Sequence, residues 1–324
     1  MSGGLCLDAL NEAGCPLPLD LEVLGVAGAR IQARDDDRFF SYAGTLETAG
    51  IQLAIVFDTD SIPDDRLEHW GAAFAVARPA STLFVLGNEM DAGHLTEKSD
   101  SSGIMSPEEY AAYWHHLAIG ISSVNPEAKL IVGGLVSGQV WWAMNLQPHL
   151  DPVPDGWDVH AYGKGPIEAR GLYNDYRREL GQDIYALEWW EGHHSIAGFV
   201  YMLDRSVKRW CRYCWSDGMW PEPPMGLIDV DGNQKPEYHA FKAALEGGPT
   251  MAGQLEGLDN DDFVLGPVWP ETPDIKDIGN GVRLRGHHSG VAMEIDGVVT
   301  PLMGANIESV EAIAKKHGFR LVPA

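Results

Sequence analysis

The feature that most limits the fold is a regular alternation of short apolar segments with longer amphipathic ones, which runs from the N-terminus to about residue 247. This alternation is typical of βα units arranged around a parallel sheet. Eight units can be counted, with strands predicted at residues 5–9, 29–33, 53–57, 82–86, 129–133, 157–160, 184–188 and 212–216.

The segments between these strands carry helix signals. Ser106 followed by Glu109 forms a capping box, and apolar residues then recur at helical spacing. Pro63 and the acidic residues after it are typical of a helix start, and Gly247 of a helix end. Helices are therefore predicted at residues 63–77, 106–124, 167–180, 195–210 and 235–247.

Eight strand and helix pairs in about 247 residues match a (β/α)8 TIM barrel in size and number. An open doubly wound sheet is the main alternative. It is disfavoured because no GxGxxG follows the first strand and eight strands would be many for such a sheet. We predict an α/β protein with a barrel over residues 1–247.

The character of the sequence changes after this point. Residues 248–262 are typical of a linker. Short strands are predicted at 282–286, 291–295 and 297–302, a helix at 306–319 and a last strand at 320–322. Residues 263–324 are therefore predicted to form a small α+β subdomain appended to the barrel.

Acidic residues outnumber basic ones by 47 to 23, which gives a formal net charge of -24. This charge disfavours nucleic acid, anionic membrane surfaces and polyanionic glycans as partners, and suits a neutral substrate. A merely solubilising or salt-tolerant surface explains it equally well. No stretch of about 20 apolar residues predicts a membrane span, and the N-terminus has no signal-peptide pattern. Both a secreted and a cytoplasmic location stay open, as does the oligomeric state.

The cysteines and histidines predict no metal centre. The pair in Cys211-Arg-Tyr-Cys214 has ligand spacing, but no second pair completes a zinc site, so buried thiols are predicted. A disulfide from Cys6 to either of these cysteines stays open, and Cys15 is the fourth cysteine. No metal or organic cofactor is expected.

Two predicted strands end in a glutamate. The apolar segment 82–86 leads to Asn88 and Glu89, and segment 184–187 leads to Glu188. Active sites of (β/α)8 barrels lie at the C-terminal ends of the strands, and strands four and seven lie nearly opposite, so the two carboxylates can face each other. A separation of about 5 Å suits a retaining glycosidase and about 6.5 to 9.5 Å an inverting one. Other strand ends carry Arg30, Asp58, His160, Tyr162 and Trp215.

The two carboxylates would need different surroundings. The general acid must keep its proton, which a low-dielectric pocket or a nearby negative charge favours. The nucleophile must stay ionised, so it needs hydrogen-bond donors or a cation, and Arg30 and Tyr162 are candidates.

Aromatic faces stack on pyranose rings, so tryptophans near the strand ends are candidate sugar platforms. Neighbouring aromatic residues usually place one ring in the core, so about half of them are expected to contact ligand. Of Trp141, Trp142, Trp189, Trp190, Trp215 and Trp220, the substrate-binding residues predicted here are Trp142, Trp189 and Trp215.

Taken together, Asn88-Glu89 on strand four, residues 160–162 (HAY) on strand six, Glu188 on strand seven and Trp215 on strand eight resemble the clan A glycoside hydrolases. The segment 214–245 is similar to the way many of those barrels end. The resemblance covers residues 1–247, whereas residues after 248 match no appendage of the clan.

The resemblance implies a role for each residue. Glu89 corresponds to the general acid/base, Glu188 to the nucleophile and Asn88 to the residue that binds the sugar 2-hydroxyl. The remaining correspondences are a contact of His160 or Tyr162 with either glutamate, a sugar floor at Trp215, and a nucleophile-steadying role for Arg30. Asp58 departs from the pattern, since several clan families have histidine there, and is predicted to contact sugar instead.

The resulting prediction is a retaining glycoside hydrolase that cleaves a β-linked poly- or oligosaccharide in endo fashion, such as a bacterial surface or wall glycan. Two alternatives stay open. One is a noncatalytic glycan-binding barrel that acts as a targeting module. The other is a barrel enzyme of different chemistry, a lyase or a transglycosylase.

Overall fold

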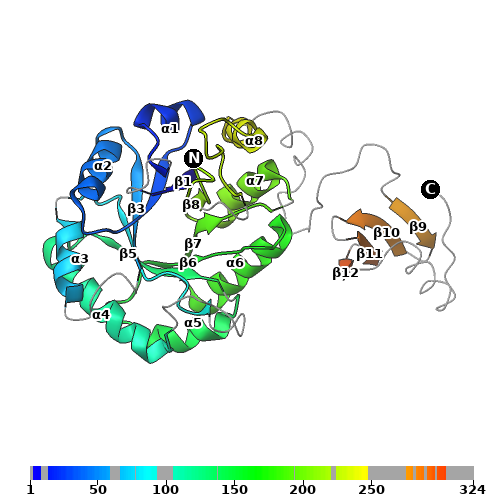
Figure 1. The fold of residues 1–324 in the computed structure, drawn as a ribbon. Helices are drawn as coiled ribbons and strands as arrows, with labels where there is room; N and C mark the ends of the chain where they lie inside the picture. Colours follow the sequence, from blue (N-terminus) through cyan, green and yellow to red (C-terminus); the bar gives the residue numbers. More distant parts are fainter. Residues whose placement is uncertain are drawn as a thin grey trace. The chain divides into compact units, whose positions relative to one another are not determined.

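The computed structural model describes residues 3–8, 14–58, 66–76, 78–92, 105–136, 138–192, 194–219 and 224–246, and four strands between residues 275 and 303. Eight parallel strands close into a barrel in the order β1 to β8, with helices around the outside (Figure 1). The strands are β1 Gly3–Leu7, β2 Gly28–Gln32, β3 Gln52–Phe57, β4 Leu83–Leu86, β5 Lys129–Leu135, β6 Gly156–Val159, β7 Asp183–Trp189 and β8 Trp210–Arg212. This confirms the predicted (β/α)8 barrel.

The helices follow the strands in turn. They are α1 Pro18–Leu24, α2 Asp37–Thr48, α3 Leu67–Ala75, α4 Pro107–Val124, α5 Val140–Leu146 with the 3-10 turn η5 Gln147–His149, α6 Pro166–Leu180, α7 Ile196–Ser206 and α8 Pro236–Leu245. The predicted capping box is present at α4, where Ser106 and Glu109 each accept the other's backbone N–H. β8 differs from its prediction: it ends at Arg212 instead of beginning there.

The apolar residues form two clusters, as expected of a barrel whose strands are buried on both faces. One lies between the strands and the helices and holds most of the large rings, among them Trp114, Trp157 and Trp210. The other gathers strand residues that include Val56, Ile131 and Leu187. Side chains that alternate along a strand supply opposite faces of the barrel wall, which explains the division.

The cysteines are free thiols. Cys6, Cys211 and Cys214 are buried in the second cluster, and Cys15 is partly buried. The predicted burial holds for these three, and no bridge joins Cys6 to the other two.

Two strands carry a register shift near their C-terminal ends. In β5 the shift lies between Val132 and Leu135 and takes in Gly133 and Gly134. In β7 it lies between Ala186 and Trp189. An extra residue in one strand turns the following side chains relative to the regular alternation. Both shifts lie at the end of the barrel where the glutamates were predicted.

By its internal contacts the chain divides into two compact units, Met1–Thr250 and Met251–Ala324. The second unit contains a four-stranded antiparallel sheet in the order β12-β11-β10-β9, with strands β9 Ile275–Gly279, β10 Val282–His287, β11 Gly290–Ile295 and β12 Val298–Met303. β9 was not predicted. The predicted linker at 248–262, helix at 306–319 and strand at 320–322 lie outside the described residues and stay predictions.

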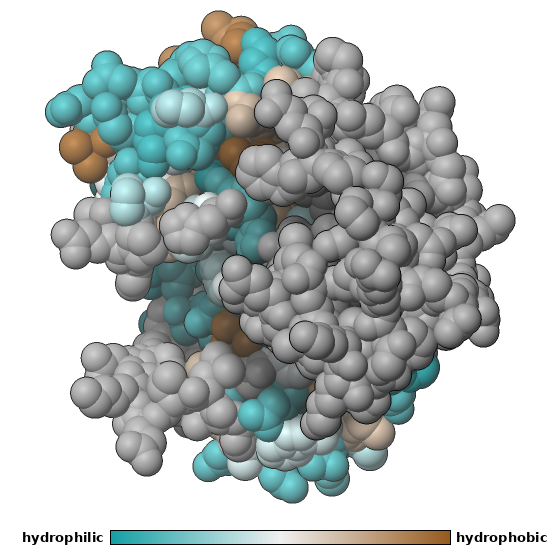
Figure 2. All heavy atoms as spheres, turned by 90° about the vertical axis from the view of Figure 1, so that its right-hand side faces the viewer, coloured by the Kyte–Doolittle hydropathy of each residue, from teal (hydrophilic) through white to brown (hydrophobic). Residues whose placement is uncertain are grey.

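The described surface is mostly hydrophilic on the face shown in Figure 2, with apolar residues scattered over it. Exposed apolar residues in such a pattern are ordinary for a globular protein. Among the described helices, none combines the length and hydropathy that crossing a bilayer requires.

Candidate active site

A cavity of about 660 Å³ lies at the C-terminal ends of the barrel strands, and each of the eight strand ends contributes to its wall. This volume is within the range of small-ligand sites. Among the predicted site residues, the wall contains Arg30, Asp58, Asn88, Glu89, Tyr162 and Glu188.

An unusual backbone turn carries Glu89 to the cavity. Gly87 has φ of 88° and Glu89 has φ of 55°, and among the described residues no other non-glycine residue has a positive φ. The Glu89 N–H donates to the carbonyl of Gly134 at 2.9 Å. A side chain on Gly133 would come within 1.9 Å of the Gly87 carbonyl oxygen, and one on Gly134 within 2.6 Å of Asn88 Oδ1. The two glycines of β5 therefore make room for this turn, and a strained backbone of this kind is common at functional sites.

Glu188 projects into the cavity from the register shift in β7 and is almost fully buried. Arg30 Nη1 lies 2.7 Å from Glu188 Oε2, and the Tyr162 hydroxyl donates to Oε1. Arg30 also donates through Nη2 to Asn88 Oδ1 at 2.8 Å. The side-chain amide nitrogen of Asn88 is therefore the group that this residue can offer to a ligand. These contacts suit an ionised carboxylate.

Arg30 and Tyr162 have the charge states that hydrogen-bond donors to the Glu188 carboxylate need. Burial alone would lower the pKa of Arg30, but the charge of Glu188 outweighs it, so the pKa is raised. Burial, followed by the charge of Glu188, raises the pKa of Tyr162 well above its usual value. Arg30 thus stays cationic and Tyr162 stays a neutral donor.

His160 lies between two carboxylates. Its Nδ1 is 3.0 Å from Glu89 Oε1 and its Nε2 is 3.2 Å from Asp158 Oδ2. Burial would lower the pKa of His160, but the charges of Asp158 and Glu188 and the hydrogen bonds to Asp158 and Glu89 raise it to about 10. His160 is therefore an imidazolium at neutral pH and donates to both carboxylates.

The two glutamates lie close together. One carboxylate oxygen of Glu89, one of Glu188 and a ring nitrogen of His160 all lie within 4.8 Å of one another. The same three groups could in principle hold a metal ion. In the arrangement described here His160 uses both ring nitrogens as donors, to Glu89 and Asp158. A histidine ligand must be neutral, so binding an ion would require His160 to lose a proton and its contact with Glu89.

Asp58 follows β3 and lies on the side of the cavity that the neighbouring strands β1 to β3 form. Gln32 donates from Nε2 to Asp58 Oδ2 at 2.8 Å, and Arg34 donates to Gln32 Oε1 at 2.6 Å. Asp8, which follows β1, lines the same cavity. This side of the cavity is therefore acidic and rich in hydrogen-bonding groups.

Two of the predicted sugar-binding tryptophans do not reach the cavity. Trp142 belongs to α5, is fully buried and packs against Tyr110 with ring centroids 5.9 Å apart. Trp189 is fully buried and stacks on Phe199 at 5.1 Å. Their prediction as substrate-binding residues is wrong, because both rings fill the layer between strands and helices and expose no face.

Trp215 requires the same correction. It is 7% exposed, packs near Tyr238 at 6.4 Å and does not line the cavity. Because β8 ends earlier than predicted, Tyr213, the first residue after this strand, takes the cavity position. Trp190, rather than its neighbour in β7, lines the cavity as well. Trp220 lies outside the described residues.

Sequence reasoning overlooked Asp158, Gln32, Asp8 and Tyr213. A usable signal existed for Asp158, since Asp158 in β6 is followed at a spacing of two by His160 and Tyr162, and a period of two places residues of an extended segment on one face. Tyr213 could have been found from the same period, as it follows Cys211 by two residues and Cys211 is buried in the interior cluster.

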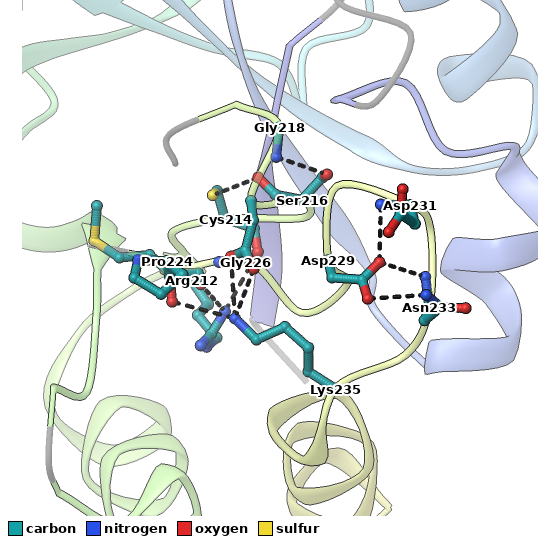
Figure 3. Close-up of polar contacts among 12 residues, drawn as sticks. Arg212, Cys214, Ser216, Gly218, Pro224, Gly226, Asp229, Asp231, Asn233 and Lys235 are labelled. Atoms are coloured by element: carbon teal, nitrogen blue, oxygen red, sulfur yellow. Dashed lines mark hydrogen bonds and ion pairs between the residues drawn. The ribbon is translucent and has the colours of Figure 1, made fainter. Parts of the chain in front are cut away.

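Polar contacts hold the segment between β8 and α8, which carries Tyr213 (Figure 3). Buried Arg212 donates to both oxygens of Glu191 at 2.9 and 2.5 Å and to the carbonyls of Cys214 and Met225. Lys235 Nζ lies 3.0 Å from the nearer oxygen of Asp217. These contacts join the segments after β7 and β8 on which Trp190 and Tyr213 lie.

The loop 229–233 is a hairpin turn, with Ile228 and Gln234 paired antiparallel at its base. Asp229 accepts the backbone N–H groups of Asp231 and Asn233 and the side-chain amide of Asn233 (Figure 3). Its carboxylate therefore closes the turn.

Fold and site define a (β/α)8 barrel with a close pair of glutamates at the ends of β4 and β7. Comparison with known protein families gave no matching family model, and a search of curated proteins gave no match. Solved structures do match. A glucosidase from Croceicoccus marinus has a TM-score of 0.61 at 12% identity, over 75% of this chain and 66% of that one.

Two further solved structures, of enzymes with different names, also match this chain. A GH128 subgroup II endo-β-1,3-glucanase from Pseudomonas viridiflava matches with a TM-score of 0.54 and 18% identity over 75% of this chain and 97% of its own. The Bacteroides uniformis β-glucuronidase matches with a TM-score of 0.54 and 13% identity over 75% of this chain but 34% of its own. At these identities the likeness establishes the fold: this chain has the barrel that these glycosidases share.

Proposed function

We propose that the protein is a glycoside hydrolase that cleaves a β-linked glycan with retention of configuration. The observation that carries this proposal is the pair of glutamates on β4 and β7, with carboxylate oxygens within 4.8 Å of each other at the mouth of a barrel. Retaining enzymes need about 5 to 5.5 Å between the two carboxyl groups, whereas inverting ones need about 6.5 Å or more.

Glu188 is the proposed nucleophile. Its carboxylate accepts hydrogen bonds from Arg30 and Tyr162, which orient it within the cavity. It attacks the anomeric carbon and forms a covalent glycosyl-enzyme while the glycosidic bond breaks.

Glu89 is the proposed acid/base. His160 holds Oε1, so Oε2 is the oxygen that would carry the proton to the leaving group. When Glu188 becomes an ester its negative charge disappears, and Glu89 has just given up its proton. The imidazolium of His160 then stabilises the Glu89 carboxylate, which deprotonates the water that releases the sugar.

Asn88 is the proposed ligand of the sugar 2-hydroxyl. Arg30 occupies its Oδ1, which orients the amide nitrogen as a donor. Hydrogen bonds at the 2-hydroxyl strengthen in the transition state of such reactions, so this contact would contribute to catalysis as well as binding.

Endo action is not part of this proposal. The sequence favoured it because tryptophans from several loops were expected along the cleft. Among the described residues, the aromatic side chains that line the cavity are Tyr162, Trp190 and Tyr213. The likenesses to glucosidase and endo-glucanase structures support both modes equally.

The test is a pair of alanine variants assayed with azide. Glu188→Ala should lose turnover by at least about 10⁴-fold, and azide should restore part of it and give a glycosyl azide of inverted configuration. Glu89→Ala should keep activity on substrates with good leaving groups, and its azide product should keep the original configuration.

The same assay separates the alternatives. Glycan binding by the parent without any turnover would mean a noncatalytic barrel. An unsaturated product would mean a lyase, and transfer to a second sugar with no new reducing end would mean a transglycosylase. Azide products of the same configuration from both variants would contradict the roles assigned to Glu89 and Glu188.

A further inference from the structure

Two aromatic side chains of the cavity wall lie on segments that are far apart in the sequence. Trp190 is the first residue after β7, and Tyr213 is the first residue after β8. Both line the cavity, and both are partly buried against the second apolar cluster. The Tyr213 N–H donates to the Trp189 carbonyl at 2.7 Å, so the two segments are adjacent in space.

A buried ion pair joins these two segments. Arg212, the last residue of β8, is fully buried, and Glu191, which follows Trp190, is 4% exposed. Arg212 donates through Nε and Nη2 to the two carboxylate oxygens of Glu191, at 2.9 and 2.5 Å. A bidentate contact between arginine and carboxylate fixes orientation as well as distance. Each partner is the immediate sequence neighbour of one of the two cavity aromatic residues.

The third nitrogen of the same guanidinium binds the segment after β8. Arg212 Nη1 donates to the carbonyl of Cys214 at 3.3 Å and to that of Met225, which also lines the cavity, at 3.0 Å. Lys235, at the start of α8, holds this segment from its other side, with Nζ 3.2 Å from the Pro224 carbonyl oxygen (Figure 3). All three nitrogens of one buried arginine are therefore used to join the segments after β7 and β8.

We propose that Arg212 and Glu191 are positioning residues for glycan binding, because the pair fixes how Trp190 and Tyr213 lie relative to each other in the cavity wall. This inference rests on the proposed function and adds a device that controls substrate affinity. Arg212 and Glu191 do not themselves line the cavity, so their effect passes through the neighbouring wall residues.

A buried ion pair is a poor device for stability alone. The loss of hydration of two charges offsets much of their attraction, and two apolar residues of similar volume often stabilise a protein equally well. Removal of one partner, in contrast, leaves an unpaired buried charge and destabilises the protein. Two methionines can fill the space of this pair, but they cannot reproduce its five directed hydrogen-bond donors. The positioning role therefore predicts that stability and glycan binding respond differently to the exchange of both partners.

The double variant Arg212→Met/Glu191→Met separates the two roles, since it leaves no unpaired charge. Its urea midpoint should lie near that of the parent, whereas Arg212→Met alone should unfold at a clearly lower urea concentration. KM of the double variant for a β-1,3-glucan or a β-1,4-glucan, whichever the parent cleaves, should rise about tenfold, because the aromatic faces no longer match the sugar. Its kcat should stay within about threefold of the parent value, which is the pattern of lost binding.

Amide hydrogen exchange followed by peptide mass spectrometry gives a readout that does not depend on turnover. Peptides that cover residues 189–192 and 213–215 should exchange at least about tenfold faster in the double variant, because the pair no longer holds these segments together. Peptides from β4 and β6 should exchange as in the parent. A merely structural pair predicts parental exchange at all of these peptides once stability is restored.

The matched control is Arg78→Met/Glu47→Met, which makes the same exchange at another ion pair. Arg78 Nη1 lies 2.5 Å from Glu47 Oε2, and both side chains are mostly buried. Glu47 lies in the last turn of α2 and Arg78 follows α3, so the pair lies at the end of the barrel away from the cavity. This control should leave KM and the exchange of both peptides unchanged.

A second variant, Arg212→Lys, keeps the charge opposite Glu191 but loses the planar fork. It should raise KM and speed exchange in the same two peptides, and it decides the proposal by the same criteria if the double variant does not fold. Parental KM in a folded variant, with or without faster exchange, would overturn the positioning role and leave the glycosidase proposal intact.

Failure of the proposed function gives a different result. If the parent cleaves no polymer, the glycosidase proposal fails, and calorimetric binding of the same two polymers decides the positioning role. Weaker binding by the double variant than by the parent, together with faster exchange, supports this role. Equal binding by both proteins, or no binding by the parent, contradicts it.

Discussion

Asp158 offers the most informative single substitution outside the cavity wall. It is fully buried in β6, accepts the Leu187 N–H through Oδ1 at 2.7 Å and contacts His160 Nε2 through Oδ2 at 3.2 Å. The charge of His160 and this hydrogen bond outweigh burial and lower the pKa of Asp158. Asp158→Asn keeps the shape of the side chain but removes the charge that stabilises the imidazolium.

The sign and size of the effect follow from the pKa of His160, which folding raises from 6.5 to about 10. A raised histidine pKa stabilises the folded state fully below about pH 6.5, and this stabilisation is lost as the pH rises towards 10. Breaking a buried charged pair costs about 3 to 5 kcal/mol. We expect Asp158→Asn to lower the free energy of unfolding by about 3 kcal/mol at pH 6.5 and by about 1 kcal/mol or less at pH 9.5.

Urea unfolding followed by tryptophan fluorescence at the two pH values measures this difference, and groups that titrate elsewhere cancel between parent and variant. A loss of stability that is equal at both pH values would refute the reasoning, since it would mean that Asp158 acts by packing and not through the charge of His160. In turnover assays, the activity of the variant should also begin to fall at a lower pH than that of the parent, because His160 loses its proton earlier.

Three further substitutions test how the site is built. In steady-state assays, Tyr213→Ala should lower kcat/KM by about tenfold, or ~1.4 kcal/mol. Trp215→Phe should leave kcat/KM nearly unchanged. An equal loss in both variants would mean that Trp215 also contacts the substrate. Gly134→Ala should reduce kcat by more than 10²-fold with the fold retained by circular dichroism, because its Cβ would lie 2.6 Å from Asn88 Oδ1 at a residue with φ of 45°; normal kcat would show that the turn tolerates the shift. Arg212→Met should destabilise the protein by about 3 to 5 kcal/mol in urea unfolding, because buried Glu191 loses its partner, and a change below 1 kcal/mol would contradict this.

The barrel and the two glutamates could be predicted from sequence for one physical reason. Parallel strands buried on both faces are almost continuously apolar, so the polar residue that ends such a strand is conspicuous. Asn88 and Glu89 after β4 and Glu188 at the end of β7 could be recognised in this way, and barrel geometry brings strands four and seven across from each other.

The aromatic wall of the cavity could not be predicted in the same way. Whether Trp189 or Trp190 reaches the cavity depends on the register shift in β7, which no local pattern reveals. Trp215 was predicted in the cavity position that Tyr213 occupies. The reason is that the apolar residues after Arg212 extend the strand pattern beyond the end of β8. From the sequence, the acidic residues of the cavity could be recognised only as part of the net charge. Their positions around the cavity follow from the strand ends in the structure.

The central claim is that Glu188 becomes a covalent glycosyl ester during turnover. Incubation with a 2-deoxy-2-fluoro β-glycosyl fluoride of the sugar that the protein cleaves, followed by peptide mass spectrometry, tests it most directly. The account predicts time-dependent inactivation with one added sugar on the peptide that contains Glu188. A label on Glu89 or on another carboxylate, or continued turnover with no labelled peptide, would contradict it.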